Sequence, residues 1–113
     1  PPTSLIIDAA LRPNIAVDPG KELTLVSGLV TTPLVVVTPA SAPYNNLADL
    51  IKAARAANGK FSYGWGTLGM RVGMEELSQK TGVKMTPIGY KSAGQSVPAI
   101  VSGEIDMLMI DMA

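Results

Sequence analysis

The stretch from Tyr90 to Asp106 constrains the fold of this chain more than any other part of its sequence. A loop of small and polar residues is followed by a mostly apolar segment, a Ser102-Gly103 turn and a second apolar run. This order is typical of a strand end, a helix, a tight turn and the next strand. The first backbone N–H groups of such a helix have no partner within it, so the loop suits the binding of an anion.

A second loop of the same character, Tyr63 to Gly69, lies upstream and is rich in glycine. After it, Met70, Met74 and Leu77 recur at helical spacing, so this loop also leads into a helix. Two such loops in one small chain predict a site that holds a small acid by backbone groups rather than by catalytic side chains.

Strand and helix patterns alternate along the chain. Apolar, β-branched runs predict strands, and apolar residues at helical spacing predict helices. The expected strands are Leu34–Thr38, Phe61–Gly64, Val83–Ile88 and Ile105–Ile110, and the expected helices are Leu47 to the Asn58-Gly59 cap, Met70–Thr81 and Ser96–Val101. We also expect residues 23–37 to be extended, as two strands or one strand bent at Thr31-Thr32-Pro33, and residues 9–20 to be irregular.

Three local details accompany these elements. Asn46 is expected to cap the helix that follows it, with Asp49 in the position of a capping box. Pro98 fits the expected helix only if it lies in the first turn. Leu34–Thr38 is expected to be buried on both faces, as strands of parallel sheets are.

The alternation predicts an α/β fold, a parallel-rich mixed sheet with flanking helices, formed by residues 1–113 as a single domain. Right-handed crossovers would put every strand-to-helix loop along one edge of that sheet. Ligands of open α/β sheets bind at this edge. We therefore expect the two small-residue loops to lie together.

The composition excludes several kinds of chemistry. Nine basic and nine acidic residues give a net charge of zero, so no basic excess attracts nucleic acid or an anionic membrane. The absence of histidine and cysteine removes the commonest general base, the commonest metal ligands and a thiol nucleophile, so we expect no catalytic residue, metal or cofactor. The chain opens with Pro1-Pro2-Thr3, which suggests a mature product or a fragment.

Most of the chain resembles the second domain of the Bug family, the periplasmic solute receptors of tripartite tricarboxylate transporters. No single motif is diagnostic, but their shared order and spacing make the match fairly specific. The motifs are the Asn14–Leu29 pattern, Thr32–Val37, Leu47–Lys52, Gly59–Gly64, Tyr90-Lys91 and Gly103–Asp106. The loop from Gly66 to Gly73 departs from the family pattern, with bulkier residues at Leu68, Met70 and Arg71, so the ligand is expected to differ.

The resemblance implies one lobe of a periplasmic-binding-protein-like clamp that closes on a small carboxylate and delivers it to a membrane permease. It implies a periplasmic, non-enzymatic transport protein whose partners are the missing first lobe and the permease. The candidate ligand-binding residues are Thr32, Gly66, Thr67, Gly69, Tyr90, Lys91, Ser92 and Ala93.

Each candidate also has an ordinary structural interpretation. The glycine loop could be a tight strand–helix turn, Lys91 could be solvated, and Tyr90 could pack its ring on the sheet edge. Thr31 and Thr32 could simply cap a kink in the strand.

Other residues have open interpretations. Arg71 could bind a carboxylate, but a helix pair with Glu75 is favoured. Trp65 could wall a site or anchor a partner. Odd spacing puts Asp106 and Asp111 on opposite faces, which argues against an acid pair.

Two rival functions belong to other classes. An orphan lobe could be a self-associating interaction module, most simply a homodimer, with an exposed apolar face at Trp65, Leu68, Met70 and the methionine-rich C-terminus. An enzyme or nucleotide-binding domain is the second rival. The lack of histidine, cysteine, a P-loop lysine signature and G-x-G-x-x-G argues against it.

Overall fold

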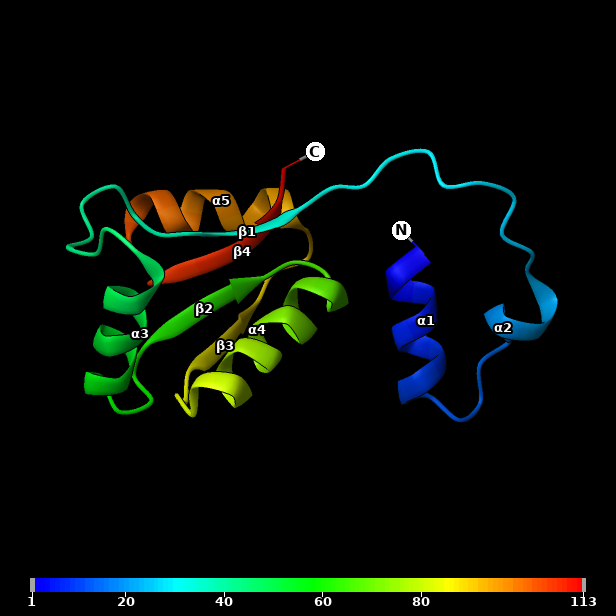
Figure 1. Ribbon diagram of the computed structural model, residues 1–113, viewed down its shortest axis with the longest axis horizontal. Coiled ribbons are helices and arrows are strands. Elements are labelled where there is room, and N and C mark those ends of the chain that lie inside the picture. The colour runs from blue at the N-terminus through cyan, green and yellow to red at the C-terminus, as the bar shows by residue number, and fades with distance from the viewer. Residues whose placement is uncertain (1, 113) are drawn as a thin grey trace.

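A four-stranded mixed sheet lies at the centre of the structure, a computed structural model that describes residues 2–112 (Figure 1). Helices cover both of its faces, which confirms the α/β fold expected from the sequence. The elements in chain order are α1 Pro2–Leu11, α2 Pro19–Glu22, β1 Leu34–Val37, α3 Leu47–Ala56, β2 Ser62–Trp65, α4 Leu68–Thr81, β3 Thr86–Gly89, α5 Ala93–Ser102 and β4 Met107–Asp111.

The strand order is β1-β4-β2-β3, so the last strand of the chain is an inner strand. β2 is parallel to both β3 and β4, and Gly64 lies opposite Ile88 and Leu108 in the two pairings. β1 is antiparallel to β4, with Val36 opposite Met109. The parallel-rich mixed sheet is therefore confirmed.

The direction of β1 corrects one expectation. Because β1 runs against the other strands, its strand-to-helix loop, residues 38–46, leaves from the opposite edge to the loops after β2 and β3. The start of β1 lies instead at the edge where β2, β3 and β4 end. There the N–H of Met112 donates to the carbonyl of Pro33 at 3.3 Å.

Side chains of β4 divide the core into two clusters. Met107 faces α3 and α4 in a cluster that lies on one side of the sheet. Its neighbour Leu108 faces α5 on the other side, because successive side chains of a strand point to opposite faces. The first cluster contains Leu50, Ala54, Phe61, Tyr63, Met74, Val83 and Met107, and the second contains Ala99, Ile100, Ile105 and Leu108.

The N-terminal third differs from its sequence-based expectations. Residues 2–11 form helix α1, whereas an irregular region was expected from residue 9. Residues 23–33 form no strand, and β1 begins only at Leu34. The expectation that Leu34–Thr38 is buried on both faces is wrong, because β1 is an edge strand with Leu34 exposed and the next residues only half-buried. The arm formed by α1, α2 and residues 23–33 extends the molecule to 47 Å along its longest axis (Figure 1).

Two helices begin earlier than expected because side chains cap them. The hydroxyl of Thr67 accepts from the N–H of Met70, so α4 begins at Leu68. The hydroxyl of Ser92 likewise caps α5, which begins at Ala93. Pro98 therefore lies inside α5 rather than in its first turn, which corrects that expectation. Strands β3 and β4 begin slightly later than expected, at Thr86 and Met107.

The cap of α3 is as the sequence predicts. The side-chain oxygen of Asn46 accepts from the N–H of Asp49, and the Asn46 amide donates to the Asp49 carboxylate, both at 2.9 Å. The helix ends at Ala56, and Asn58 and Gly59 just beyond it have left-handed φ angles of 49° and 86°. Both ends of α3 are thus set by residues adjacent to it in the sequence.

The loops after β2 and β3 meet at one edge of the sheet. The N–H of Tyr90 donates to the carbonyl of Trp65 at 2.9 Å. Gly66 approaches the backbone of Ser92 and Ala93 so closely that a methyl group in place of its hydrogen would overlap both. The expectation that the two loops share an edge is confirmed, and glycine at position 66 is what permits their contact.

Replacing Asn46 by alanine should lower the free energy of unfolding by about 1 kcal/mol, because α3 loses its capping oxygen. Urea denaturation of Asn46→Ala against the parent chain measures this. Asn45→Ala is the matched control, because Asn45 is also exposed but precedes the cap. Equal losses in the two variants would contradict the capping role.

Gly66→Ala should destabilise the fold by about 1–3 kcal/mol, because the added methyl group forces the two loops apart. Gly69→Ala is the control. Its new methyl group meets Thr3 at 3.6 Å and Thr67 at 4.0 Å, both ordinary contact distances, and alanine favours a helix. Chemical denaturation should show a loss for the first variant and none for the second. A neutral Gly66→Ala would mean that the loops are not held in contact.

Candidate functional site

A hollow of about 390 Å³ opens at the sheet edge where β2 and β3 end and β1 begins. It lies between α1, the first turn of α4 and the residues that lead into β1. Its lining residues are Thr3, Ser4, Val30, Thr32, Leu34, Thr67, Gly69, Met70 and Asp111. Three residues predicted from the sequence, Thr32, Thr67 and Gly69, therefore share one hollow although they come from different parts of the chain.

Backbone N–H groups border this hollow at the start of α4. Leu68 and Gly69 occupy its first two positions, where an N–H has no carbonyl partner within the helix. The side chain of Thr67 takes up only the N–H of Met70, at 3.4 Å. An anion placed here would meet free donors and the positive end of the helix.

The start of α5 lies directly beside the start of α4. Gly66 brings the two together through its contact with Ser92 and Ala93. Ala93 and Gly94 hold the first positions of α5, and the Ser92 hydroxyl accepts from the N–H of Gln95 at 3.4 Å. The predicted residues Gly66, Ser92 and Ala93 are thus in contact, but they stand next to the hollow rather than in its lining.

Tyr90 and Lys91 lie outside the lining of the hollow. The N–H of Tyr90 already donates to Trp65, and its ring packs against the cluster under α5. The Tyr90 hydroxyl is buried and has no hydrogen-bond partner among residues 2–112; burial and the nearby Glu104 carboxylate raise its pKa. Lys91 is exposed to solvent. The ring of Tyr90 packs as its ordinary interpretation expects, and a ligand-binding role for Tyr90 and Lys91 stays a prediction.

Three polar residues of the hollow were missed by sequence reasoning. Thr3 and Ser4 come from α1, which had not been recognised as a helix, and Asp111 comes from the end of β4. The hollow therefore carries four hydroxyl groups, including those of Thr32 and Thr67, and one carboxylate. Chain topology, which no local pattern encodes, brings Asp111 to this edge.

Arg71 does not form the helix pair that was favoured. Its guanidinium carbon lies 5.1 Å from the centre of the Trp65 ring, in a cation–π arrangement. Glu75 instead accepts a hydrogen bond of 2.7 Å from the hydroxyl of Tyr63. Burial, followed by this carboxylate, raises the pKa of Tyr63 above its ordinary value. Tyr63 thus takes the carboxylate that Arg71 was expected to hold.

Asp106 and Asp111, at the two ends of β4, lie in different environments. Asp106 accepts from the N–H and the hydroxyl of Ser62, at 2.7 and 2.8 Å, just before the strand begins. Asp111 ends the strand at the other edge, so the two carboxylates do not form a pair. Within residues 2–112 no three acidic side chains gather where they could hold a metal ion.

The apolar surface is not where it was expected. Met70 is only 1% exposed, and Trp65 and Leu68 are half-buried, so they form no bare apolar face. Met107 is fully buried in the core, and of the C-terminal methionines only Met112 is exposed. The most exposed apolar side chains are instead those of residues 25–30 in the arm.

Comparison with known proteins identifies the relatives of this chain. Residues 4–113 match the family described as the tripartite tricarboxylate transporter family receptor. One relative, described as the UPF0065 protein in the tcbD-tcbE intergenic region of Pseudomonas sp. (strain P51), is 27% identical over 109 residues, which are 95% of this chain and 32% of that protein. The chain thus spans about a third of the length of this curated relative.

Solved structures share the fold of this chain. A periplasmic transporter matches with a TM-score of 0.88 and 23% identity over 97% of this chain and 38% of its own. Rpa4515 of R. palustris, solved with adipate, matches with a TM-score of 0.68 and 25% identity over 72% of this chain and 28% of its own. In the described part of the chain no helix has the length and apolar character that crossing a membrane requires. The chain belongs to the tripartite tricarboxylate transporter receptor family.

Proposed function

We propose that this chain is a solute-binding lobe that holds one carboxylate group of a small organic acid by backbone amides. The observation that carries the proposal is the meeting of two helix starts, α4 and α5, at the edge of a hollow. Each supplies N–H groups without helical partners, and the positive ends of the two helix dipoles lie beside each other because Gly66 contacts Ser92 and Ala93. The structure of Rpa4515 with adipate supports this class of ligand.

The chemistry of the hollow suggests how the rest of the ligand is held. Hydroxyl groups of Thr32 and Thr67 can donate to a carboxylate oxygen of the ligand. Leu34 and Met70 offer apolar surface to a methylene chain. A short acid with a carboxylate at one end, placed at the helix starts and away from Asp111, therefore fits the hollow better than a large solute does.

In this proposal the chain acts as the second lobe of a clamp. It spans about a third of its curated relative, and a single lobe leaves one side of the ligand in water. The remaining contacts would come from a first lobe, after which a membrane permease would take the ligand up from the periplasm. No step requires catalysis, and the sequence has neither histidine nor cysteine to supply it.

Self-association is a second candidate function, favoured by one observation. Leu25, Val26, Leu29 and Val30 are each more than four-fifths exposed, which is unusual for apolar side chains in a folded protein. Leu25, Val26 and Leu29 are not part of the lining of the hollow, so self-association and carboxylate binding are independent possibilities.

The isolated chain should bind adipate with a dissociation constant of about 1 mM, which corresponds to about 4 kcal/mol. NMR titration of the labelled chain should show saturable shifts at the amides of residues 66–70 and 92–95. The uncharged analogue 1,6-hexanediol is the control. Equal responses to the two compounds, or shifts scattered away from these loops, would contradict the proposed site.

A backbone amide can be removed at the start of α4 with little effect on the fold. Leu68→Pro deletes one N–H at the first helical position, where proline is tolerated. It should weaken adipate binding about fivefold or more, equivalent to about 1 kcal/mol. Leu68→Ala, which loses the side chain but keeps the N–H, should bind like the parent. If both variants lose affinity equally, the side chain and not the amide is responsible.

A further inference from the structure

Among the residues that line the hollow, only Asp111 carries a charge. In the pairing of β1 with β4 it lies opposite Leu34, and both residues line the hollow. Successive side chains of a strand point to opposite faces, so Asp111 shares the face of Met107 and Met109, which pack toward α3 and α4. The Asp111 carboxylate therefore lies on the α4 side of the sheet, at the edge where α4 begins.

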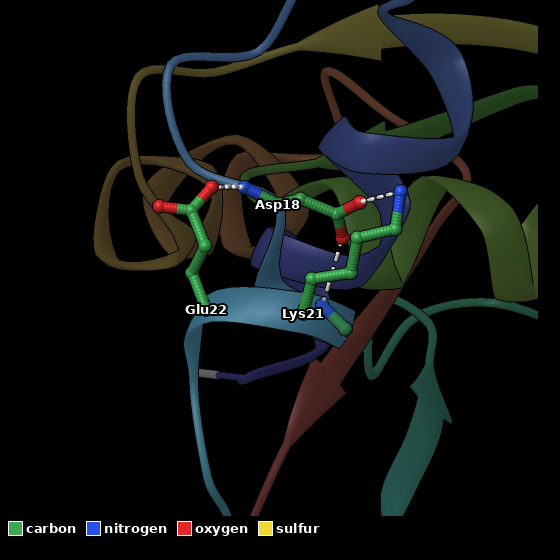
Figure 2. Close-up of polar contacts among 4 residues, drawn as sticks. Asp18, Lys21 and Glu22 are labelled. Carbon is green, nitrogen blue, oxygen red and sulfur yellow. Dashed lines mark hydrogen bonds and ion pairs between the residues drawn. The ribbon is translucent and has the colours of Figure 1, made fainter.

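The charge of Asp111 has no partner within residues 2–112. Most other acidic side chains have one, and Figure 2 shows an example. The Asp18 carboxylate accepts from the N–H of Gly20 at 3.0 Å and lies 3.5 Å from the Lys21 ammonium. No side-chain hydrogen bond or ion pair in the same range of the chain includes Asp111. The described lining of the hollow has no lysine or arginine, so this carboxylate is available to a ligand.

The hollow thus has two ends of opposite electrostatic character. The start of α4 offers the N–H groups of Leu68 and Gly69 and the positive end of the helix dipole. Asp111 offers a negative charge at the end of β4. β4 pairs with β2, the strand that leads into α4, and neighbouring strands lie about 4.8 Å apart. One small molecule in the hollow of about 390 Å³ can therefore reach both ends.

A dicarboxylate is complementary to only one of these ends. Its second carboxylate, on reaching Asp111, would bring two like charges together in a hollow without a cation. A methylene chain that covers Asp111 would remove water from the carboxylate and return no hydrogen bond. An ammonium group avoids both penalties, because it supplies three N–H donors and the opposite charge.

We propose that Asp111 selects acids that carry an ammonium group at the end opposite to their carboxylate, so that the hollow prefers a short amino acid of this kind to a dicarboxylate. This inference rests on the proposed function, which places the ligand carboxylate at the start of α4. Asp111 then determines specificity in two ways, because the same charge attracts the ammonium and repels a second carboxylate. Leu34, opposite Asp111 in the ladder, offers apolar surface to the methylene groups between the two charges.

Three compounds of matched length test this preference in the parent chain. Adipate, 6-aminohexanoate and hexanoate share one carboxylate and end in a carboxylate, an ammonium and a methyl group. NMR titration of the labelled chain, followed at the amides of residues 66–70, gives the three dissociation constants. We expect 6-aminohexanoate to bind about fivefold more tightly than either other compound. Equal or weaker binding of 6-aminohexanoate would overturn the inference.

Asp111→Asn removes the charge at almost constant size. It should weaken the binding of 6-aminohexanoate about fivefold and leave hexanoate unchanged. Glu104→Gln is the matched control, because it removes a carboxylate that is also exposed but lies before β4, at the opposite edge of the sheet. This variant should bind all three compounds as the parent does. Equal losses of 6-aminohexanoate affinity in the two variants would show a general effect of charge and overturn the role of Asp111.

The same titrations separate this inference from the proposed function. If none of the three compounds shifts the amides of residues 66–70 in the parent chain, carboxylates do not bind at the start of α4, and the inference fails together with the proposed function. If all three shift these amides with equal affinity, the proposed function stands and only the selection by Asp111 is wrong. The ranking in the parent chain needs no variant, so the inference can be refuted even if Asp111→Asn does not fold.

Discussion

Insertion of β4 between β1 and β2 is the constraint on which the rest of this structure depends. Leu108 lies opposite both Val37 and Gly64, so one residue joins the antiparallel and the parallel halves of the sheet. Its neighbour Met107 points to the other face and completes the cluster under α3 and α4. Both cores, and the edge at which the helix starts meet, follow from the position of this strand.

The sequence predicts well the elements that are set by local chemistry. A few adjacent residues determine each of three such features. They are the cap of α3 by Asn46, the left-handed Asn58 after α3 and the left-handed Gly82 after α4. The starts of α4 and α5 were placed late because Thr67 and Ser92 were assigned to ligand-binding loops, although each also caps a helix. Their capping role is observed, whereas their ligand-binding role stays a prediction, and pattern reasoning considered only the second.

The contacts between residues that are far apart in the chain were harder to predict from the sequence. Residues 23–37 have the composition of a buried strand, but composition does not say where a strand finds its partners, and only Leu34–Val37 pairs here. In the candidate site, too, the local features were predicted and the long-range contacts were not. Its two loops were recognised from their small residues, whereas Asp111 and the α1 residues Thr3 and Ser4 reach the hollow through the chain topology alone. The pairing of Arg71 was misjudged because Tyr63, a residue of the sheet, competes for Glu75.

The central place of β4 has a consequence for the order in which the molecule can form during synthesis. A ribosome makes β1, β2 and β3 before β4, and β2 can pair with β3 as soon as residues 86–89 have emerged. β1 has no neighbour until residues 107–111 emerge, because its ladder is made with β4 alone. The nascent chain therefore carries an open gap beside β2, which the last strand must enter. Strand pairing across such a long sequence separation is slow compared with helix formation, so completion of the sheet is expected to be a late event.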